Sequence, residues 1–193
     1  MVRRLSNRHK PVKLKLDLHT HCMEATRVPN PTEEAVNEIV DVIRARGLDG
    51  IAVTEHDDVT YGYKVRDIVQ RCFNDEFLII PGQEIDEGRV QVVELLLPGG
   101  VTFRFLAHPG YPYPGEYPTD SQLENLHGVE IDNRLHVREL DRPAIRAIAE
   151  KHNLVMLKNS DAHEVRDIGR FYNEVSIDEL VERVLSDGNH VIT

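Results

Sequence analysis

Short apolar runs alternate along this chain with longer stretches in which apolar residues recur every three or four positions. The first pattern is typical of strands and the second of amphipathic helices. The expected strands cover residues 13–19, 50–54, 77–80, 90–97, 101–107, 129–131 and 154–157. The expected helices cover residues 31–47, 63–73, 142–152 and 178–185. This alternation predicts a parallel sheet with helical cover, either open or closed into a barrel.

Turn and capping residues mark several boundaries between these elements. We expect Asn30 to cap the first helix, and we expect the third strand to end at residues 81–82, a Pro-Gly pair. Residues 98–100, Pro-Gly-Gly, indicate a hairpin or a short excursion. Residues 109–118 are rich in proline and tyrosine, which predicts a surface connection beside His108, with a substrate lid as the alternative.

The overall composition suits one globular domain. The chain has 193 residues, of which 40% are hydrophobic, and we expect a single domain over residues 1–193 with a flexible or peripheral start at 1–12. It has neither a run of about 20 apolar residues nor a signal-peptide pattern, so the expected location is cytoplasmic, without a membrane partner. The formal net charge of −10 argues against general nucleic-acid binding, which needs a basic face.

The most informative polar residues lie where predicted strands end. His19 and His21 are two residues apart, so both imidazoles leave the strand on one face and can share an ion. Asp161 and His163 repeat this spacing after a later strand. Strand ends are where α/β folds place their sites, so these pairs are expected to face a common site.

Three further apolar strands are followed by metal-ligand residue types: His56, Glu84 and His108. Histidine combined with carboxylate suits zinc, manganese or iron. Any one of these histidines alone is more simply explained as a solvated or capping group. Five predicted strands that are each followed by a histidine or carboxylate, however, predict a metal site. For the remaining histidines a structural role is expected, with His136 kept as an additional candidate because it follows Asn133. The remaining histidines are His9, His127, His136, His152 and His190.

Taken in order, these blocks resemble the PHP (polymerase and histidinol phosphatase) family. The matching blocks are Asp17 to His21, Thr54 to His56, Gly82 to Glu84, His108 to Gly110, Glu130 to Asn133, Ser160 to His163 and Ile168 to Arg170. Each block is common alone, whereas the ordered set is specific. The resemblance implies an α/β fold of the distorted (β/α)7 TIM-like barrel type and a metal-dependent phosphoesterase activity.

The resemblance also implies a set of ligands for up to three divalent ions. The first ion would take His19, His21, Glu84 and Asp161. Glu84 would bridge to a second ion that His108 also holds, and a third ion would take His56 and His163. The implied reaction is hydrolysis of a small-molecule or nucleotide phosphate ester by a metal-activated water, with Glu84, Asp161 and His56 as the catalytic residues.

Two positions depart from the family pattern. Family members usually carry a ligand where this chain has Thr26 or Arg27, and another shortly after the Gly-x-Glu glutamate, where residues 88–91 offer none. We therefore expect one firmly bound ion, a weaker second and a still weaker third, with Glu24 or Gln91 as partial substitutes. Arg27 and Arg89 stand where ligands usually stand. A guanidinium at either position would grip a substrate phosphate with two parallel hydrogen bonds, although a surface or counter-ion role fits equally well.

Two other functions remain open at this level. A metal site on a barrel also suits hydrolysis of an amide or another carbon–nitrogen bond. With two usual ligands missing, the domain would alternatively serve as a metal-binding or sensing module without turnover. The expected partner is a phosphorylated small molecule, while the sequence leaves the metal, the substrate and the oligomeric state open.

Overall fold

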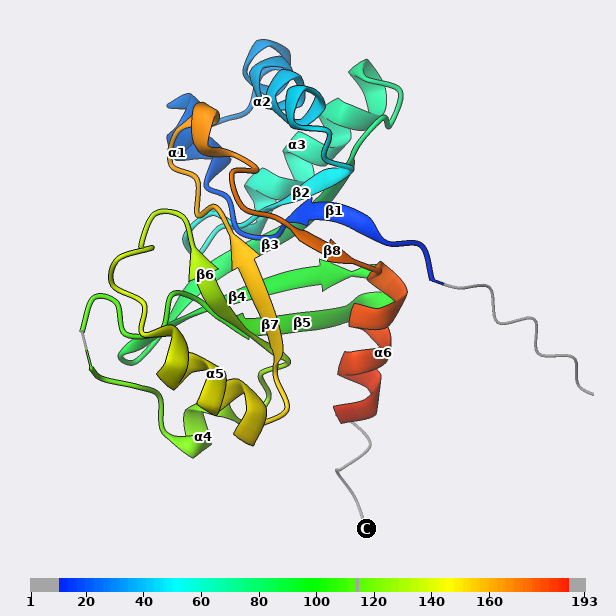
Figure 1. Ribbon diagram of the computed structural model, residues 1–193. Coiled ribbons are helices and arrows are strands. Elements are labelled where there is room, and N and C mark those ends of the chain that lie inside the picture. Colours follow the sequence, from blue (N-terminus) through cyan, green and yellow to red (C-terminus); the bar gives the residue numbers. More distant parts are fainter. Residues whose placement is uncertain (1–10, 114, 188–193) are drawn as a thin grey trace, which may run out of the picture.

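The computed structural model describes residues 11–113 and 115–187 (Figure 1). The predicted flexible start at residues 1–12 therefore lies largely outside the described residues, as do His9 and His190. The strands are β1 Leu14–Asp17, β2 Gly50–Val53, β3 Leu78–Glu87, β4 Val90–Leu97, β5 Val101–Leu106, β6 Gly128–Asn133, β7 Val155–Asn159 and β8 Asn173–Val175. The helices are α1 Cys22–Thr26, α2 Glu33–Arg46, α3 Val59–Cys72, α4 Asp120–Leu123, α5 Arg142–Lys151 and α6 Ile177–Asp187.

The eight strands form one mixed sheet in the order β7-β6-β5-β4-β3-β2-β1-β8. The pairs β1–β2, β2–β3, β5–β6 and β6–β7 are parallel, as the alternating pattern predicts. The pairs β3–β4 and β4–β5 are antiparallel, because short turns join these strands where a regular (β/α) barrel would have helices. The sheet is therefore a mixed one and not purely parallel.

Side chains and short backbone bridges nearly close this sheet into a barrel. The short strand β8, which the hydrophobic pattern did not reveal, pairs antiparallel with β1. The side chain of Asn173 in β8 accepts a hydrogen bond from the Lys158 backbone N–H (2.9 Å) and donates to the carbonyl of the same residue (3.0 Å). Beyond the strand ends, the His21 N–H donates to the carbonyl of Ala162 (2.9 Å). The segments that follow β1 and β7 are thereby held side by side.

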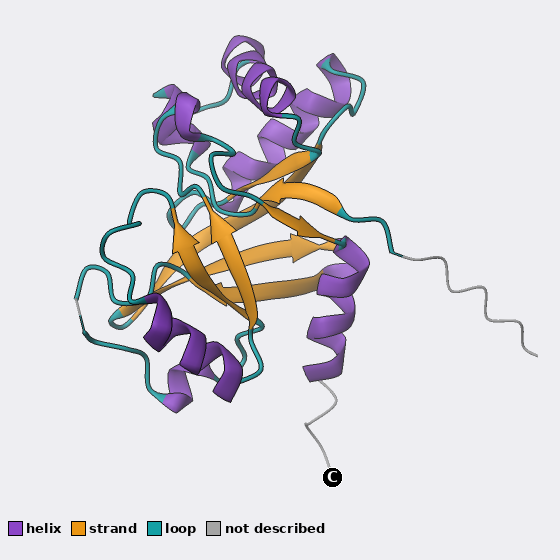
Figure 2. Cartoon of the chain, viewed as in Figure 1, coloured by secondary structure: helices purple, strands orange, loops and turns teal. Residues whose placement is uncertain are grey.

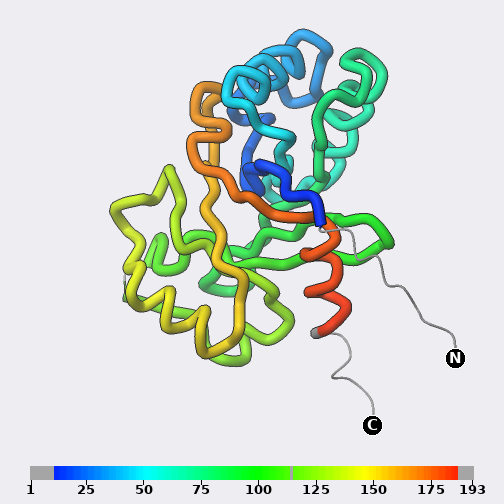
Figure 3. The backbone as a smooth tube through the Cα atoms, turned by 45° about the vertical axis from the view of Figure 1, so that its right-hand side comes forward, coloured from blue at the N-terminus to red at the C-terminus, as the bar shows by residue number. Residues whose placement is uncertain are grey.

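Helices cover the outside of the barrel in three groups (Figure 2). α1, α2 and α3 lie together on one side, α5 lies against β6 and β7 with α4 beside it, and α6 stands beside β5. The helices α2 and α3 run next to each other in both the first view and the rotated one (Figure 3). Three buried apolar clusters result: one under α2 and α3, one inside the barrel around Phe103 and Phe105, and one under α5 around Ile145.

Two local predictions are corrected by the structure. The cap of α2 is Thr32, whose hydroxyl accepts from the Ala35 N–H, while Asn30 instead accepts a hydrogen bond from Lys64. The strand β3 does not end at the Pro-Gly pair but continues to Glu87. A Cβ at Gly82 would lie 2.5 Å from the Glu94 carbonyl oxygen, so glycine permits the close approach of β4 on which this continuation depends.

Within residues 11–113 and 115–187, no helix has the length and apolar character needed to cross a membrane.

Candidate metal centre

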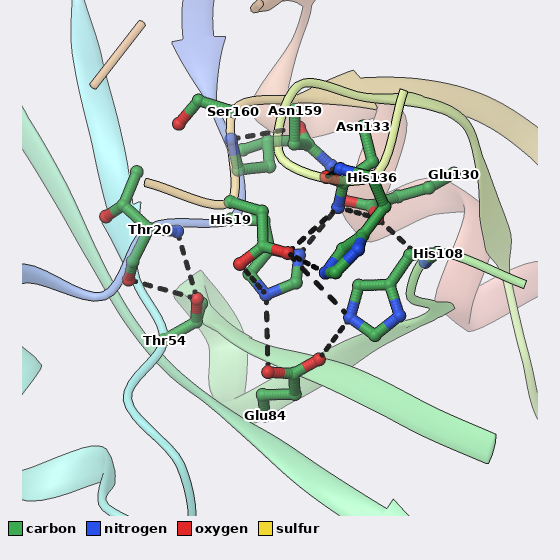
Figure 4. Close-up of polar contacts among 12 residues, drawn as sticks. His19, Thr20, Thr54, Glu84, His108, Glu130, Asn133, His136, Asn159 and Ser160 are labelled. Atoms are coloured by element: carbon green, nitrogen blue, oxygen red, sulfur yellow. Dashed lines mark hydrogen bonds and ion pairs between the residues drawn. The ribbon is translucent and has the colours of Figure 1, made fainter. Parts of the chain in front are cut away.

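The predicted ligand residues converge beyond the ends of β1, β2, β5 and β7, and Glu84 joins them from within β3. Short backbone bridges extend the sheet there, pairing Thr20 with Ala162 and His56 with Glu84. Figure 4 shows the imidazole of His19 close to Glu84 and His108, with Glu130 beside it. Residues more than 140 positions apart in sequence therefore share one pocket, because parallel strands bring their carboxyl ends to the same rim.

Four side-chain atoms form an inner cluster: Nε2 of His19, Nε2 of His21, Oε2 of Glu84 and Oδ1 of Asp161. The two histidine nitrogens lie 3.1 Å apart. The His19 nitrogen is 3.5 Å from each carboxylate oxygen, and the His21 nitrogen is 3.3 Å from Glu84 and 3.2 Å from Asp161. All four side chains are almost fully buried.

These separations are short enough for the donor atoms to share metal ions. Zinc–ligand distances near 2.1 Å give a tetrahedron with edges of about 3.4 Å. The five distances just given span 3.1 to 3.5 Å, close to such an edge. One atom each from His19, His21 and Glu84 lie within 4.8 Å of one another, as do atoms of His19, His108 and Asp161. In addition, Oδ1 of Asp161 is buried and accepts no hydrogen bond from the described residues. Such an unsatisfied oxygen is available to coordinate a cation. The inner cluster therefore fits a divalent ion.

The other oxygens of the same two carboxylates face a second cluster. Oε1 of Glu84 lies 2.9 Å from Nε2 of His108, and Oδ2 of Asp161 lies 3.6 Å from Nε2 of His136 and 3.9 Å from that of His108. Glu84 and Asp161 thus present one oxygen to each cluster, which is the arrangement that bridges paired ions. His136, kept only as an additional candidate from the sequence, reaches the site.

A third, outer cluster groups His56, His163 and Glu24 beside His21. Nε2 of His163 is 3.6 Å from Glu24, and the rings of His56 and His163 each stack on His21, with centroids 4.5 and 4.4 Å away. The side chains of His56 and His163 are 45% and 30% exposed. This cluster thus contains both ligands predicted for the third ion, and it adds Glu24.

Glu130 orients the inner imidazoles from behind. Its carboxylate accepts from Nδ1 of His19 (3.0 Å), the His108 backbone N–H (2.9 Å), and the side-chain amides of Asn133 (2.8 Å) and Asn159 (2.8 Å). A proton held on Nδ1 of His19 leaves Nε2 free to coordinate. Glu130 is fully buried, and the four donors around it hold its charge in place.

The carboxylates of the cluster remain ionised. Burial, the largest effect, opposes ionisation of Glu84 and Asp161, but His19 and the neighbouring imidazoles hold the pKa of both carboxyls far below the usual range. Burial also disfavours protonation of His21, but contacts with Asp161 and Glu84 raise the pKa of His21 to about 9. The carboxylates therefore stay negative and raise the affinity of the imidazoles for a positive charge, which a metal ion would supply in place of their protons.

The two arginines predicted to bind substrate lie outside this cluster. Arg89 pairs with Glu116 (2.7 Å) and its guanidinium lies 4.6 Å from the ring centre of Tyr113. Arg27 ends α1 in a left-handed conformation (φ 60°) with an exposed side chain. Gln91 lines the same cavity of about 290 Å³ as Arg89 and Tyr111, and the ring of Tyr111 lies 3.7 Å from that of His136.

The sequence analysis gave Glu130 no role of its own and kept His136 and Glu24 only as additional candidate ligands. Glu130 and Asn133 belong to a recognised sequence block, so their position at a strand end was the available signal. His136 lies three residues past the end of β6, where its backbone N–H donates to the side chain of Asn133 (3.0 Å). Of the other histidines for which a structural role was expected, two lie within the described residues: His127 accepts from the Arg104 N–H (2.9 Å) and His152 pairs with Asp120.

Comparison with known families and sequences gives one match. Residues 142–187 match the PHP-associated family. This segment includes β7 and β8 and carries Asp161 and His163 between them. No curated protein matches the chain by sequence.

Two solved structures share the fold over nearly the whole chain. A protein from Bifidobacterium adolescentis ATCC 15703, provisionally named a metal-dependent phosphoesterase, is 14% identical with a TM-score of 0.63, covering 92% of this chain and 98% of its own. PsfC from Pseudomonas syringae PB-5123 is 17% identical with a TM-score of 0.61, covering 93% of this chain and 98% of its own. At these identities the likeness shows the fold alone, and it confirms the predicted distorted TIM-like barrel.

Proposed function

The ordered motifs, the barrel and the matched segment support a protein of the PHP family, and we propose that it is a metal-dependent phosphoesterase. Its substrate is a phosphate ester of a small molecule or nucleotide, and residues 1–193 act as a single domain. It takes one to three divalent ions, zinc, manganese or iron, with one or two bound firmly. The solved relative named for this activity adds support.

The observation that carries the proposal is the sharing of two carboxylates between neighbouring clusters. Glu84 and Asp161 each direct one oxygen to the His19–His21 pair and the other toward His108 or His136. Ions held in this way would polarise a phosphoryl oxygen and lower the pKa of a water. Structural metal sites, in contrast, are usually closed and hold one ion.

Other residues of the site position the ligands and accept a proton. Glu130 fixes the ring of His19 through Nδ1, and Asn133 holds Asp161 through a hydrogen bond of 3.1 Å to Oδ2. The depressed pKa of Asp161 keeps it ionised, so it serves as a ligand and does not donate a proton. Burial is the main cause that lowers the pKa of His56, whose neutral, half-exposed ring accepts a proton at the mouth of the site.

The test is an assay of the purified protein on a panel of phosphomonoesters and short oligonucleotides, with manganese and with chelator. Turnover that requires manganese and stops with chelator is expected. Turnover insensitive to chelator, or none on any ester, would contradict the proposal. Elemental analysis of the same sample separates the alternatives, since one tight ion without turnover favours a binding module, and activity on amides alone favours an amide hydrolase.

A further inference from the structure

A small cavity opens beside the inner cluster, and neither Tyr111 nor Arg89 is among the residues that line it. It has a volume of about 160 Å³, and its walls include Asp161 and His163 as well as Arg134 and Leu135. Arg134 directly follows the last residue of β6. A cationic side chain therefore shares a cavity with two of the candidate ligands.

The backbone of Arg134 is fixed relative to those ligands. Its N–H donates to the carbonyl of Asn159 at the end of β7 (3.0 Å). The preceding residue, Asn133, donates to Asp161 (3.1 Å), and His136, two residues further on, lies 3.6 Å from the same carboxylate. The position of Arg134 is thus set by the same contacts that organise the site, as preorganised substrate binding requires.

The guanidinium of Arg134 is not paired with a carboxylate in the described part of the chain. No ion pair within residues 11–113 and 115–187 includes this guanidinium, although Glu164 and Asp167 line the same cavity. Those two acids are already paired, Glu164 with Arg166 (2.7 Å) and Asp167 with Arg170 (2.6 Å). Arg134 therefore differs from Arg89, whose guanidinium is held by Glu116 and Tyr113.

We propose that Arg134 binds the terminal phosphoryl group of the substrate in this cavity, an inference that rests on the proposed function and names its substrate-binding arginine. A guanidinium offers parallel donors that match two phosphoryl oxygens, and an anion in this cavity would contact Arg134, which shares the cavity wall with the candidate ligands Asp161 and His163. Leu135, half exposed on the same wall, gives the leaving group an apolar contact. The substrate class is a phosphate monoester.

The test measures binding of inorganic phosphate to the manganese-loaded protein by calorimetry. Arg134→Ala should raise the dissociation constant for phosphate by about 10- to 100-fold, as expected for loss of charge-assisted hydrogen bonds. Arg134→Lys should recover part of this loss, because an ammonium keeps the charge without the paired donors. Arg138→Ala, at an exposed arginine four residues later, is the matched control and should bind phosphate like the wild type.

Thermal melting and manganese content should be unchanged in all three variants, which separates phosphate binding from folding and metal loading. Phosphate binding by Arg134→Ala as tight as that of the wild type, or no phosphate binding by the wild type, would overturn the proposal. Arg134-dependent phosphate binding without hydrolysis of any ester would support Arg134 and contradict the phosphoesterase. Ester hydrolysis that is unaffected in Arg134→Ala would support the phosphoesterase and contradict the role of Arg134.

Discussion

The inner and outer clusters of the metal centre use the same residue types but differ in their surroundings. In the inner cluster, His19 and His21 are fully buried, and Glu130 fixes the ring of His19 from behind. In the outer cluster, His56 and His163 are 45% and 30% exposed, and Glu24 is 45% exposed. The number of candidate ligands is therefore a poor guide to metal-ion affinity unless the burial and orientation of the ligands are considered as well.

Orientation matters because a ligand that must be ordered on binding loses side-chain freedom. The inner side chains are already held by hydrogen bonds and packing, so little of this entropy remains to be lost. The outer side chains contact water, which competes for their nitrogen and oxygen atoms. We therefore expect ion affinity to fall from the inner cluster to the outer one, and the following substitutions test that gradient.

The largest effect is expected for Glu84→Gln. A neutral amide bridges cations poorly, so the variant should lose turnover by about 1,000-fold or more and bind less manganese. Glu94→Gln on the adjacent strand β4 is the matched control, because Glu94 contacts Gln83 and Arg104 away from the cluster. Steady-state rates and elemental analysis provide the readout, and equal losses in both variants would show that Glu84 has no special role.

The next effect is expected for Glu130→Gln, which touches no ion. All four groups around this carboxylate are donors, so the new amide N–H₂ would face a donor and leave it unsatisfied. We expect about 1–3 kcal/mol of destabilisation in urea melts and a 10- to 100-fold loss of inner-ion affinity. Unchanged metal affinity would mean that the position of His19 does not depend on this support.

A smaller effect is expected for His163→Ala, which removes a ligand from the outer cluster only. One weakly held ion should be lost per chain while the tight ion remains, and turnover should fall by about 10-fold. His152→Ala, at a surface histidine paired with Asp120, is the control and should keep both. Metal titration that shows loss of the tight ion in His163→Ala would remove the distinction between the two clusters.

The smallest effect is expected for Glu24→Gln. This partly exposed carboxylate contributes one charge to the outer cluster, so the weakest ion should bind about two- to fivefold less tightly. Glu38→Gln, at an exposed position on α2, should have no effect. The comparison is made by titration with manganese at fixed ionic strength, and identical curves for both variants would exclude Glu24 from the site.

Much of the inner cluster could be predicted from the sequence because its geometry is nearly local. The two-residue spacing of His19 and His21, repeated by Asp161 and His163, puts each pair on one face of an extended segment. The barrel then brings the segments together, since parallel strands share a rim. Glu84 was predicted on the expectation that its strand ends at the Pro-Gly pair, whereas β3 continues to Glu87 and Glu84 reaches the cluster from within the strand.

The features that escaped prediction depend on long-range packing. His136 reaches the site through a loop after β6, and its position follows from a bond to Asn133 that no periodicity reveals. The three-residue strand β8 is too short to show a pattern, and it exists because β1 offers a free edge. The cap of α2 was assigned to Asn30, whereas the helix begins at Glu33 and Thr32 therefore occupies the capping position.

We expect the inner cluster to hold the most tightly bound ion. Diffraction from manganese-soaked crystals at the manganese absorption edge would locate that ion directly. The strongest anomalous peak should lie among the facing atoms of His19, His21, Glu84 and Asp161, and weaker peaks should lie toward His108 and His163. A strongest peak elsewhere, or none between His19 and Asp161 in crystals that hold manganese, would contradict the account.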